Sequence, residues 1–238
     1  MTNLIRTEGI CRSFQTGQIQ VQALKDVNIQ VPEGGLTILR GRSGSGKTTL
    51  MNILSALDFP SQGHVYYDEM DITALKEDQR DKLRRTRMGF VFQSVALMGQ
   101  MSAYENVEFG LRIAGVPANG RRQRAVECLE RVGLAKRMKH RPAELSGGEQ
   151  QRVAIARAIA HKPAVVFADE PTAELDTKMA LNIMRLFQEL VERERITVIM
   201  TTHDPYMVEL ADQVYTLEDG QIISAVTNRE VNSPHADD

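Results

Sequence analysis

The segment from Gly41 to Thr48 constrains the fold of this chain more than any other part of its sequence. It consists of Gly-Arg-Ser-Gly-Ser-Gly-Lys-Thr and matches G-x-x-x-x-G-K-[ST], the pattern of a phosphate-binding loop. Its glycines let the backbone curl so that N–H groups face phosphate oxygens. The apolar run at 36–39 predicts a strand that enters the loop, and 48–57 predicts a helix that leaves it. This is the context in which such a loop binds a nucleotide, because the helix N-terminus favours anions.

Two side chains of the loop have distinct predicted roles. Lys47 would reach the β- and γ-phosphates of the nucleotide, and the Thr48 hydroxyl would bind Mg²⁺. The other residues expected to contact the nucleotide here are Gly41, Arg42, Ser43, Gly44, Ser45, Gly46 and Thr49. Taken alone, the loop does not distinguish a transporter motor from a kinase, a GTPase or a helicase.

A second apolar strand, predicted at 164–168, ends in two carboxylates, Asp169 and Glu170. A carboxylate at the end of a buried strand can hold Mg²⁺ through its water shell, and Asp169 suits that role. Glu170 stands one residue further on, where it could polarise a water aimed at the γ-phosphate. Acidic residues are also common where a strand simply reaches solvent, but the phosphate loop upstream favours the functional interpretation.

The segment LSGGEQQR, at 145–152, predicts the start of a helix. Ser146 and Glu149 have the spacing of a capping box, and good helix formers follow them. Gly147 and Gly148 remove side chains where the backbone is most exposed, which leaves a second helix N-terminus able to bind an anion. One chain with two such termini requires an explanation beyond nucleotide binding alone.

Short apolar strands alternate with helical segments, which predicts an α/β fold with a mostly parallel sheet. Further strands are expected at 19–31, 88–92 and 196–200, with a hairpin at Asp219-Gly220 that joins 214–217 to 221–223. A helix with one apolar face is expected over 180–191, and polar sequence of helical period predicts an inserted helical subdomain at about 95–160. We expect one domain over 1–224 and a polar tail over 225–238.

The composition restricts the environment of the protein. A formal net charge of −2 argues against an overall positive field for nucleic acid, so no nucleic-acid partner is expected. The two cysteines form neither a metal-type cluster nor a disulfide framework, which favours a reducing compartment. We find no signal peptide and no apolar run of the roughly 18 residues that span a bilayer. We therefore expect a cytosolic protein without direct membrane insertion, which reaches a membrane only through a partner.

Taken together, these motifs closely resemble the ABC ATPase family. LSGGEQQR matches the signature motif of that family, and the resemblance covers about Leu4 to Ile223. It implies a P-loop NTPase core with an N-terminal antiparallel β subdomain and an inserted helical subdomain. It also implies a head-to-tail dimer, in which ATP and Mg²⁺ lie between the phosphate loop of one subunit and the signature residues of a second copy, namely Ser146, Gly147 and Gly148.

The resemblance implies roles for four further residues. Phe14, in place of the usual tyrosine, stands where an aromatic residue stacks on adenine. Gln93 matches the glutamine that senses Mg²⁺ and links to the membrane subunit. Asp176 lies in the loop that bridges the two sites of the dimer. His203 matches the switch histidine that contacts the γ-phosphate, and would act beside Glu170 and Lys47.

The segment 71–93 resembles the branch that includes the lipoprotein-releasing and macrolide-exporter ATPases. Permeases of that branch transmit force to large extracytoplasmic domains. Because no membrane span is present, we expect a separate transmembrane permease, with this chain on the cytoplasmic face of the inner membrane. An importer ATPase remains an alternative, although a sugar-importer type would continue into a regulatory domain beyond Ile223. A role in DNA repair or translation is a second alternative, although no coiled coil, zinc module or second motor domain is visible.

Overall fold

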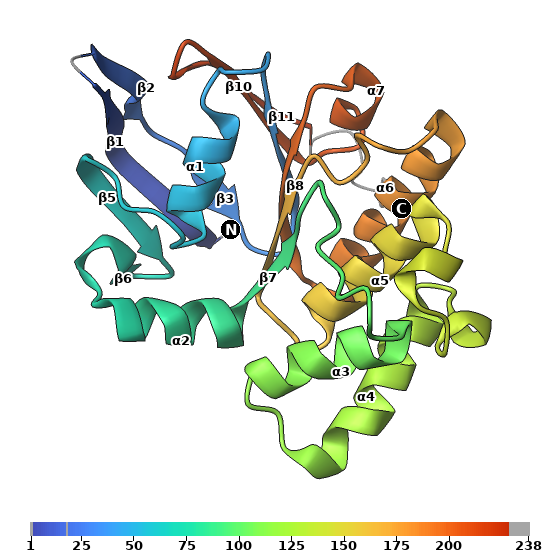
Figure 1. Cartoon of the computed structure of the whole chain (residues 1–238). Coiled ribbons are helices and arrows are strands. Elements are labelled where there is room, and N and C mark those ends of the chain that lie inside the picture. The colour runs from blue at the N-terminus through green and yellow to red at the C-terminus, as the bar shows by residue number, and fades with distance from the viewer. Residues whose placement is uncertain (1, 18, 229–238) are drawn as a thin grey trace, which may run out of the picture.

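Two β-sheets form the framework of the chain (Figure 1). The computed structural model describes residues 2–17 and 19–228. The smaller sheet is antiparallel and consists of β1 (Asn3–Thr16), β2 (Ile19–Val27), β3 (Gln30–Pro32), β5 (Gln62–Tyr67) and β6 (Met70–Asp71). The larger sheet has the order β11-β10-β4-β9-β8-β7 and is parallel apart from β11 at its edge. Its strands are β4 (Leu36–Arg40), β7 (Met88–Val91), β8 (Val165–Asp169), β9 (Thr197–Thr202), β10 (Gln213–Glu218) and β11 (Gln221–Thr227).

The helices cover both faces of the larger sheet. One group, α3 (Ala103–Ile113), α4 (Ala118–Arg131), α5 (Gly147–Ile159) and α6 (Thr177–Glu194), lies on the side away from the smaller sheet (Figure 1). Helix α1 (Lys47–Leu54) lies between the two sheets, α2 (Glu77–Arg87) follows the smaller sheet, and α7 (Pro205–Val208) is a single turn after β9. Short 3₁₀ turns occupy Ile72–Ala74, Ala135–Arg137 and Pro142–Glu144. The predicted α/β fold, with its antiparallel subdomain and inserted helices, is confirmed.

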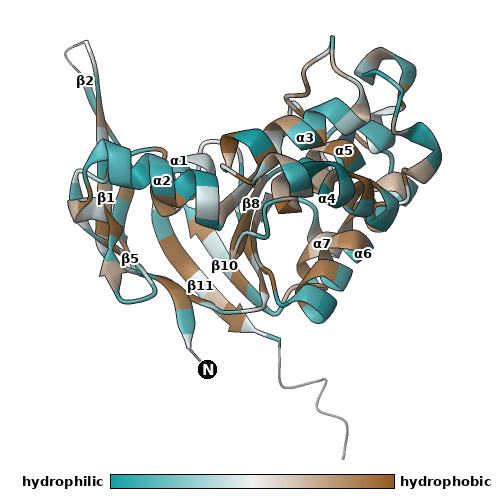
Figure 2. Ribbon diagram, turned by 90° about the horizontal axis from the view of Figure 1, so that it is seen from below, coloured by the Kyte–Doolittle hydropathy of each residue, from teal (hydrophilic) through white to brown (hydrophobic). Residues whose placement is uncertain are grey.

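Successive residues of the parallel strands enter two different hydrophobic cores. In β8, Val166 and Ala168 pack with α3 to α6, whereas Val165 and Phe167 pack with α1 and the smaller sheet. Side chains of a strand point alternately to its two faces, so a strand covered on both faces must be apolar throughout. Figure 2 shows this concentration of apolar residues along the strands, with polar residues on the outer surfaces of the helices. The predicted apolar face of 180–191 is buried in the first of these cores.

The single strand predicted over 19–31 is wrong, because the chain breaks it into β2 and β3. The Asn28 side chain accepts a hydrogen bond from the Gly9 backbone N–H at 2.7 Å and donates to the Asp26 carbonyl oxygen at 3.0 Å. Asp26 itself has a φ of 50°, in the left-handed region. These side-chain bonds to the backbone replace the ladder at this point, as Asn and Asp commonly do at turns.

Helix α1 ends at Leu54, three residues before the predicted end at residue 57. Ala56 has a φ of 58°, and its carbonyl oxygen accepts hydrogen bonds from the guanidinium of Arg80 at 2.7 and 3.2 Å. Arg80 is 2 % exposed and also stacks on the ring of Phe59 at 3.5 Å. An arginine from α2 therefore satisfies a carbonyl beyond the helix end, where the sequence pattern alone suggested further helix.

The hairpin predicted at Asp219-Gly220 is confirmed, since β10 and β11 pair on either side of it and both residues have positive φ. Strand β11 continues to Thr227, three residues into the segment expected to be a polar tail. The rest of that segment, residues 229–238, lies outside the described residues.

Candidate functional site

The phosphate loop connects the C-terminal end of β4 to the N-terminus of α1. It forms one wall of a cavity of about 680 Å³. Most of the residues predicted from separate motifs meet there, and the lining consists of Ala23, Arg42, Ser43, Gly44, Gly46, Lys47, Thr48, Thr49, Gln93, Asp169, Glu170 and His203. A cavity at the carboxyl ends of parallel strands is the place where this class of sheet binds ligands.

Lys47 is held inside the loop by the backbone itself. Its amino group donates to the carbonyl oxygens of Gly41 at 2.8 Å and Arg42 at 3.0 Å, and the residue is only 5 % exposed. A buried ammonium with two carbonyl acceptors is fixed in place beside the N-terminus of α1. Two sources of positive potential, the lysine and the helix terminus, therefore act on the same part of the cavity.

Gly46 gives the loop its sharp turn into α1. Its φ is 103°, and a Cβ atom built there would lie 2.7 Å from the carbonyl oxygen of Ala23 and 2.9 Å from a methyl carbon of Leu24. Both the backbone conformation and the close approach of β2 therefore require glycine at this position.

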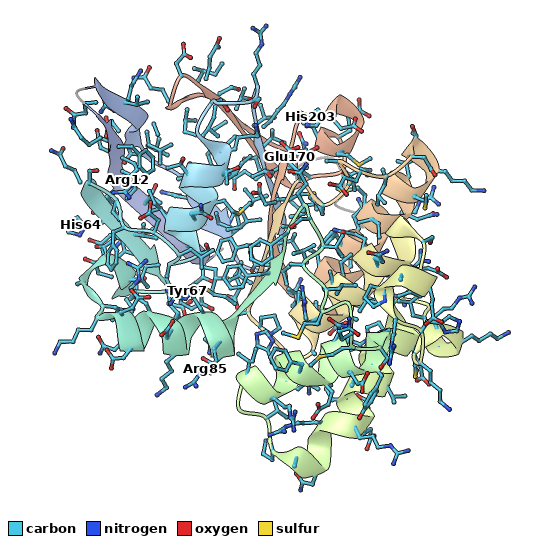
Figure 3. All side chains as sticks on the ribbon, viewed as in Figure 1. Arg12, His64, Tyr67, Arg85, Glu170 and His203 are labelled. Carbon is cyan, nitrogen blue, oxygen red and sulfur yellow. The ribbon has the colours of Figure 1, made fainter. Side chains whose placement is uncertain are left out.

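The acidic end of β8 lies opposite the loop. Asp169 pairs in register with Thr201 of β9, and the Thr201 hydroxyl donates to Asp169 Oδ1 at 2.6 Å. The same hydroxyl oxygen accepts the backbone N–H of Glu170 at 2.8 Å. Glu170 has a φ of 43°, and its Oε2 lies 3.4 Å from Nδ1 of His203. Figure 3 shows Glu170 and His203 together at this end of the larger sheet.

The loop after β7 brings Gln93 to the cavity, and Arg157, which belongs to none of the sequence motifs, supports this loop. Val95 and Ala96 have φ values of 57° and 47°. Arg157 of α5 donates to the carbonyl oxygen of Ala96 at 2.6 Å and to that of Val95 at 3.1 Å. Burial lowers the pKa of Arg157. The residue stands in an ordinary helical pattern, so the local sequence gave no signal of this contact.

The predicted capping box at the start of α5 is confirmed. The Ser146 hydroxyl accepts the Glu149 backbone N–H at 3.3 Å, and the Glu149 carboxylate accepts the Ser146 backbone N–H at 2.9 Å. This bond from the Ser146 backbone lowers the pKa of Glu149, and Arg137 at 3.0 Å acts in the same direction. Ser146, Gly147 and Gly148 do not line the cavity formed by the described residues. The motif is therefore well formed but separate from the phosphate loop of its own chain.

Of the other predicted site residues, Phe14 and Asp176 also lie outside this cavity, and the loop residues Gly41 and Ser45 do not line it either. Phe14, 39 % exposed, lines a second cavity of about 520 Å³ on the smaller sheet, and the guanidinium of Arg12 covers its ring at 4.5 Å. Asp176 caps α6, because its carboxylate accepts the Met179 backbone N–H at 2.9 Å.

An apolar groove of about 460 Å³ lies beside α2, α3 and the loop after β7. Several large apolar side chains in it are exposed, among them Leu57, Phe92, Met98 and Ile113 at 40 to 52 %. Its rim carries Asp81, Arg84 and Arg85, and Figure 3 shows Arg85 projecting from α2. No helix of the described residues is long and apolar enough to cross a membrane.

Comparison with family models and curated proteins identifies the family. The model described as "ABC transporter" matches residues 24–173, and a model described as an AAA domain matches residues 139–209. An uncharacterized ABC transporter ATP-binding protein of Methanocaldococcus jannaschii is 40 % identical over 94 % of this chain and 99 % of its own length. The macrolide export ATP-binding/permease protein of Syntrophobacter fumaroxidans is 44 % identical over 92 % of this chain. The chain belongs to the ABC transporter family, and the predicted likeness to macrolide-exporter ATPases is confirmed.

Solved structures support the same assignment. The ATP-binding cassette solved as a dimer in a post-hydrolysis state bound to ADP and Pi has a TM-score of 0.86. It is 38 % identical and covers 94 % of this chain and 98 % of that one. The chain spans about a third of the length of the macrolide export proteins that it matches, 31 % in the relative from Syntrophobacter fumaroxidans.

Proposed function

We propose that this chain is the ATP-binding and ATP-hydrolysing subunit of an ABC transporter. One observation carries the proposal: a single cavity gathers the phosphate loop, Gln93, the acidic end of β8 and His203. These residues come from four separate stretches of sequence, and each has a side chain suited to the γ-phosphate end of a nucleotide.

The donor set fits ATP with Mg²⁺. Loop N–H groups, the α1 terminus and Lys47 supply positive potential for phosphates. Thr48, Gln93 and Asp169 offer oxygen ligands within the same cavity. Among the described residues, no group of three or more His, Cys, Asp or Glu side chains is arranged so that it could hold a metal ion by itself. When bound, Mg²⁺ would neutralise charge on the phosphates.

Three side chains would carry hydrolysis. Glu170 would orient the attacking water, and its carboxylate is held near His203. Lys47 would stabilise charge that develops on the γ-phosphoryl group, from a position fixed by two backbone carbonyls. His203, 66 % exposed, would contact the γ-phosphate once a nucleotide fills the cavity. Positioning and electrostatic stabilisation account for most of the catalysis expected at such a site.

The active unit would be a head-to-tail dimer. The signature residues lie outside their own chain's cavity, yet form an open helix terminus suited to an anion. A relative solved as a dimer with ADP and Pi supports this arrangement. In the dimer, Ser146, Gly147 and Gly148 of one copy would complete the site of the other, and Asp176 would lie near the interface. Phe14 would stack on adenine if the Arg12 side chain moves off its ring.

A transmembrane permease would dock on the apolar groove beside α2 and α3, at the cytoplasmic face of the cell membrane. Exposed Phe92 and Ile113 would bury against an apolar helix, while Arg85 at the rim favours an acidic residue on that helix. Several relatives are described as ATP-binding/permease proteins, which supports coupling to export. Ile113→Asp should reduce recovery of the chain with its permease without changing ATP binding. Ile223→Asp, on an exposed site at the far edge of the sheet, is the matched control.

Substitution of Glu170 by Gln tests the hydrolytic assignment. Loss of a general base is expected to lower turnover by about 10²- to 10⁴-fold. ATP binding should persist, and a nucleotide-dependent dimer should accumulate on size-exclusion chromatography. Glu189→Gln, an exposed position on α6 away from the cavity, should behave as the wild type. Wild-type turnover in the Glu170 variant would remove Glu170 from this role.

A further inference from the structure

The hydroxyl of Thr201 joins the two acidic residues of the site. Thr201 is fully buried on β9, and its register places it directly beside Asp169 on β8. Its Oγ1 donates to Asp169 Oδ1 at 2.6 Å and accepts the Glu170 backbone N–H at 2.8 Å. No other hydroxyl among the hydrogen bonds of the described residues contacts both Asp169 and Glu170.

The direction of these bonds follows from the chemistry of a hydroxyl. A threonine hydroxyl has one proton to donate, and a backbone N–H can only donate. The hydroxyl oxygen of Thr201 therefore accepts the hydrogen bond from Glu170 N–H, and the hydroxyl group donates its own hydrogen bond to Asp169. These two hydrogen bonds fix the orientation of the Asp169 carboxylate, whose oxygen atoms are the kind of ligand that Mg²⁺ prefers.

The second bond acts where the backbone is strained. Glu170 is not glycine, yet its φ of 43° lies in the left-handed region. Such a conformation persists only where surrounding contacts fix it. The bond from its N–H to Thr201 is such a contact, and it aims the Glu170 side chain at the cavity, where Oε2 approaches His203.

We propose that Thr201 is a positioning residue that sets Asp169 for Mg²⁺ and Glu170 for the attacking water at the same time. The proposal rests on the function proposed above and adds a residue to it. The simpler alternative is a buried threonine that merely satisfies its own hydroxyl. Thr197, on the same strand, provides that comparison, because it is equally buried and its hydroxyl accepts a hydrogen bond from the Gly34 N–H at 2.9 Å, away from the acidic residues.

Three variants separate these explanations: Thr201→Val, Thr201→Ser and Thr197→Val. Thermal unfolding would first establish that each variant is folded. Binding of a fluorescent ATP analogue would then be titrated with Mg²⁺ and with EDTA, and hydrolysis would be measured over a range of ATP concentrations. If Thr201→Val fails to fold, Thr201→Ala, which also removes the hydroxyl, takes its place.

In Thr201→Val, the factor by which Mg²⁺ increases the affinity for the ATP analogue should fall about tenfold or more, because a hydrogen bond to a charged group is lost. The affinity measured in EDTA should change little. The kcat of this variant should fall by a similar factor with a nearly constant KM, and Thr201→Ser should restore both. Thr197→Val should keep the wild-type Mg²⁺ gain and kcat. Equal behaviour of Thr201→Val and Thr197→Val, or failure of Thr201→Ser to recover, would overturn the proposal. A wild-type chain without hydrolysis would contradict the proposed function instead, and the Mg²⁺-dependent affinity would still test Thr201.

Discussion

The guanidinium of Arg157 lies 2.6 Å from the carbonyl oxygen of Ala96 and ties helix α5 to the loop that carries Gln93. Helix α5 begins with the signature residues, so the two ends of this helix serve different parts of the proposed machinery. A Cβ atom at Gly110 would lie 3.0 Å from Cγ of Arg157, which shows how closely the arginine is enclosed by α3. Rotation of α5 would therefore pull directly on the Gln93 loop.

Arg157→Ala should loosen this loop and lower hydrolysis more than it lowers ATP binding. The carbonyls of Val95 and Ala96 would lose a charged donor, at a cost of about 1.5–3 kcal/mol if water does not replace it. Steady-state hydrolysis and limited proteolysis of the 93–98 segment measure the two effects. Arg185→Ala, exposed on α6, is the matched control. An unchanged proteolytic pattern would contradict a role for Arg157 in holding this loop.

Gly46→Ala should damage the phosphate loop far more than Gly44→Ala. Both residues have positive φ, so each substitution carries backbone strain of about 1–3 kcal/mol. Only at Gly46 does the added Cβ also collide with neighbouring atoms, since nothing lies within 4 Å of a Cβ at Gly44. Denaturant unfolding and ATP titration of the two variants give the comparison. Equal losses of stability would mean that strain alone, without the contact to β2, restricts this position.

Two inactive variants should restore activity when mixed, if each site is shared between two copies. Lys47→Ala disables the phosphate loop, and Gly147→Arg blocks the signature terminus. Gly147 is suitable because a Cβ there meets Leu175 at an ordinary 3.6 Å, whereas one at Gly148 would lie 2.7 Å from Met179. A mixed dimer contains one intact composite site, so hydrolysis should recover in part after mixing and fall off on dilution. Mixtures as inactive as the separate variants would argue against shared sites.

His161 should make the protein less stable in mild acid. Burial lowers the pKa of His161 from its ordinary 6.5, against a weaker opposing effect of the hydrogen bond between Nε2 and the Met88 carbonyl oxygen at 3.0 Å. Because the folded-state pKa lies below the unfolded-state value, the unfolded chain binds more protons as the pH falls below about 6.5. The free energy of unfolding should therefore decrease from about pH 7.5 to 5.5. His161→Gln should flatten that decrease, and an identical slope in both proteins would contradict the assignment.

The sequence by itself determined the α/β class, the phosphate loop, the acidic strand end and the capped signature helix. Each of these depends on residues adjacent in sequence, whose spacing sets local backbone geometry and polarity. The tertiary structure decided which contacts form between segments that are distant in the sequence. It broke the strand at 19–31 through Asn28, shortened α1 beside Arg80, and placed Thr201 between Asp169 and Glu170. These outcomes depend on strand register and helix packing, which bring together side chains far apart in the chain, and no local pattern records them.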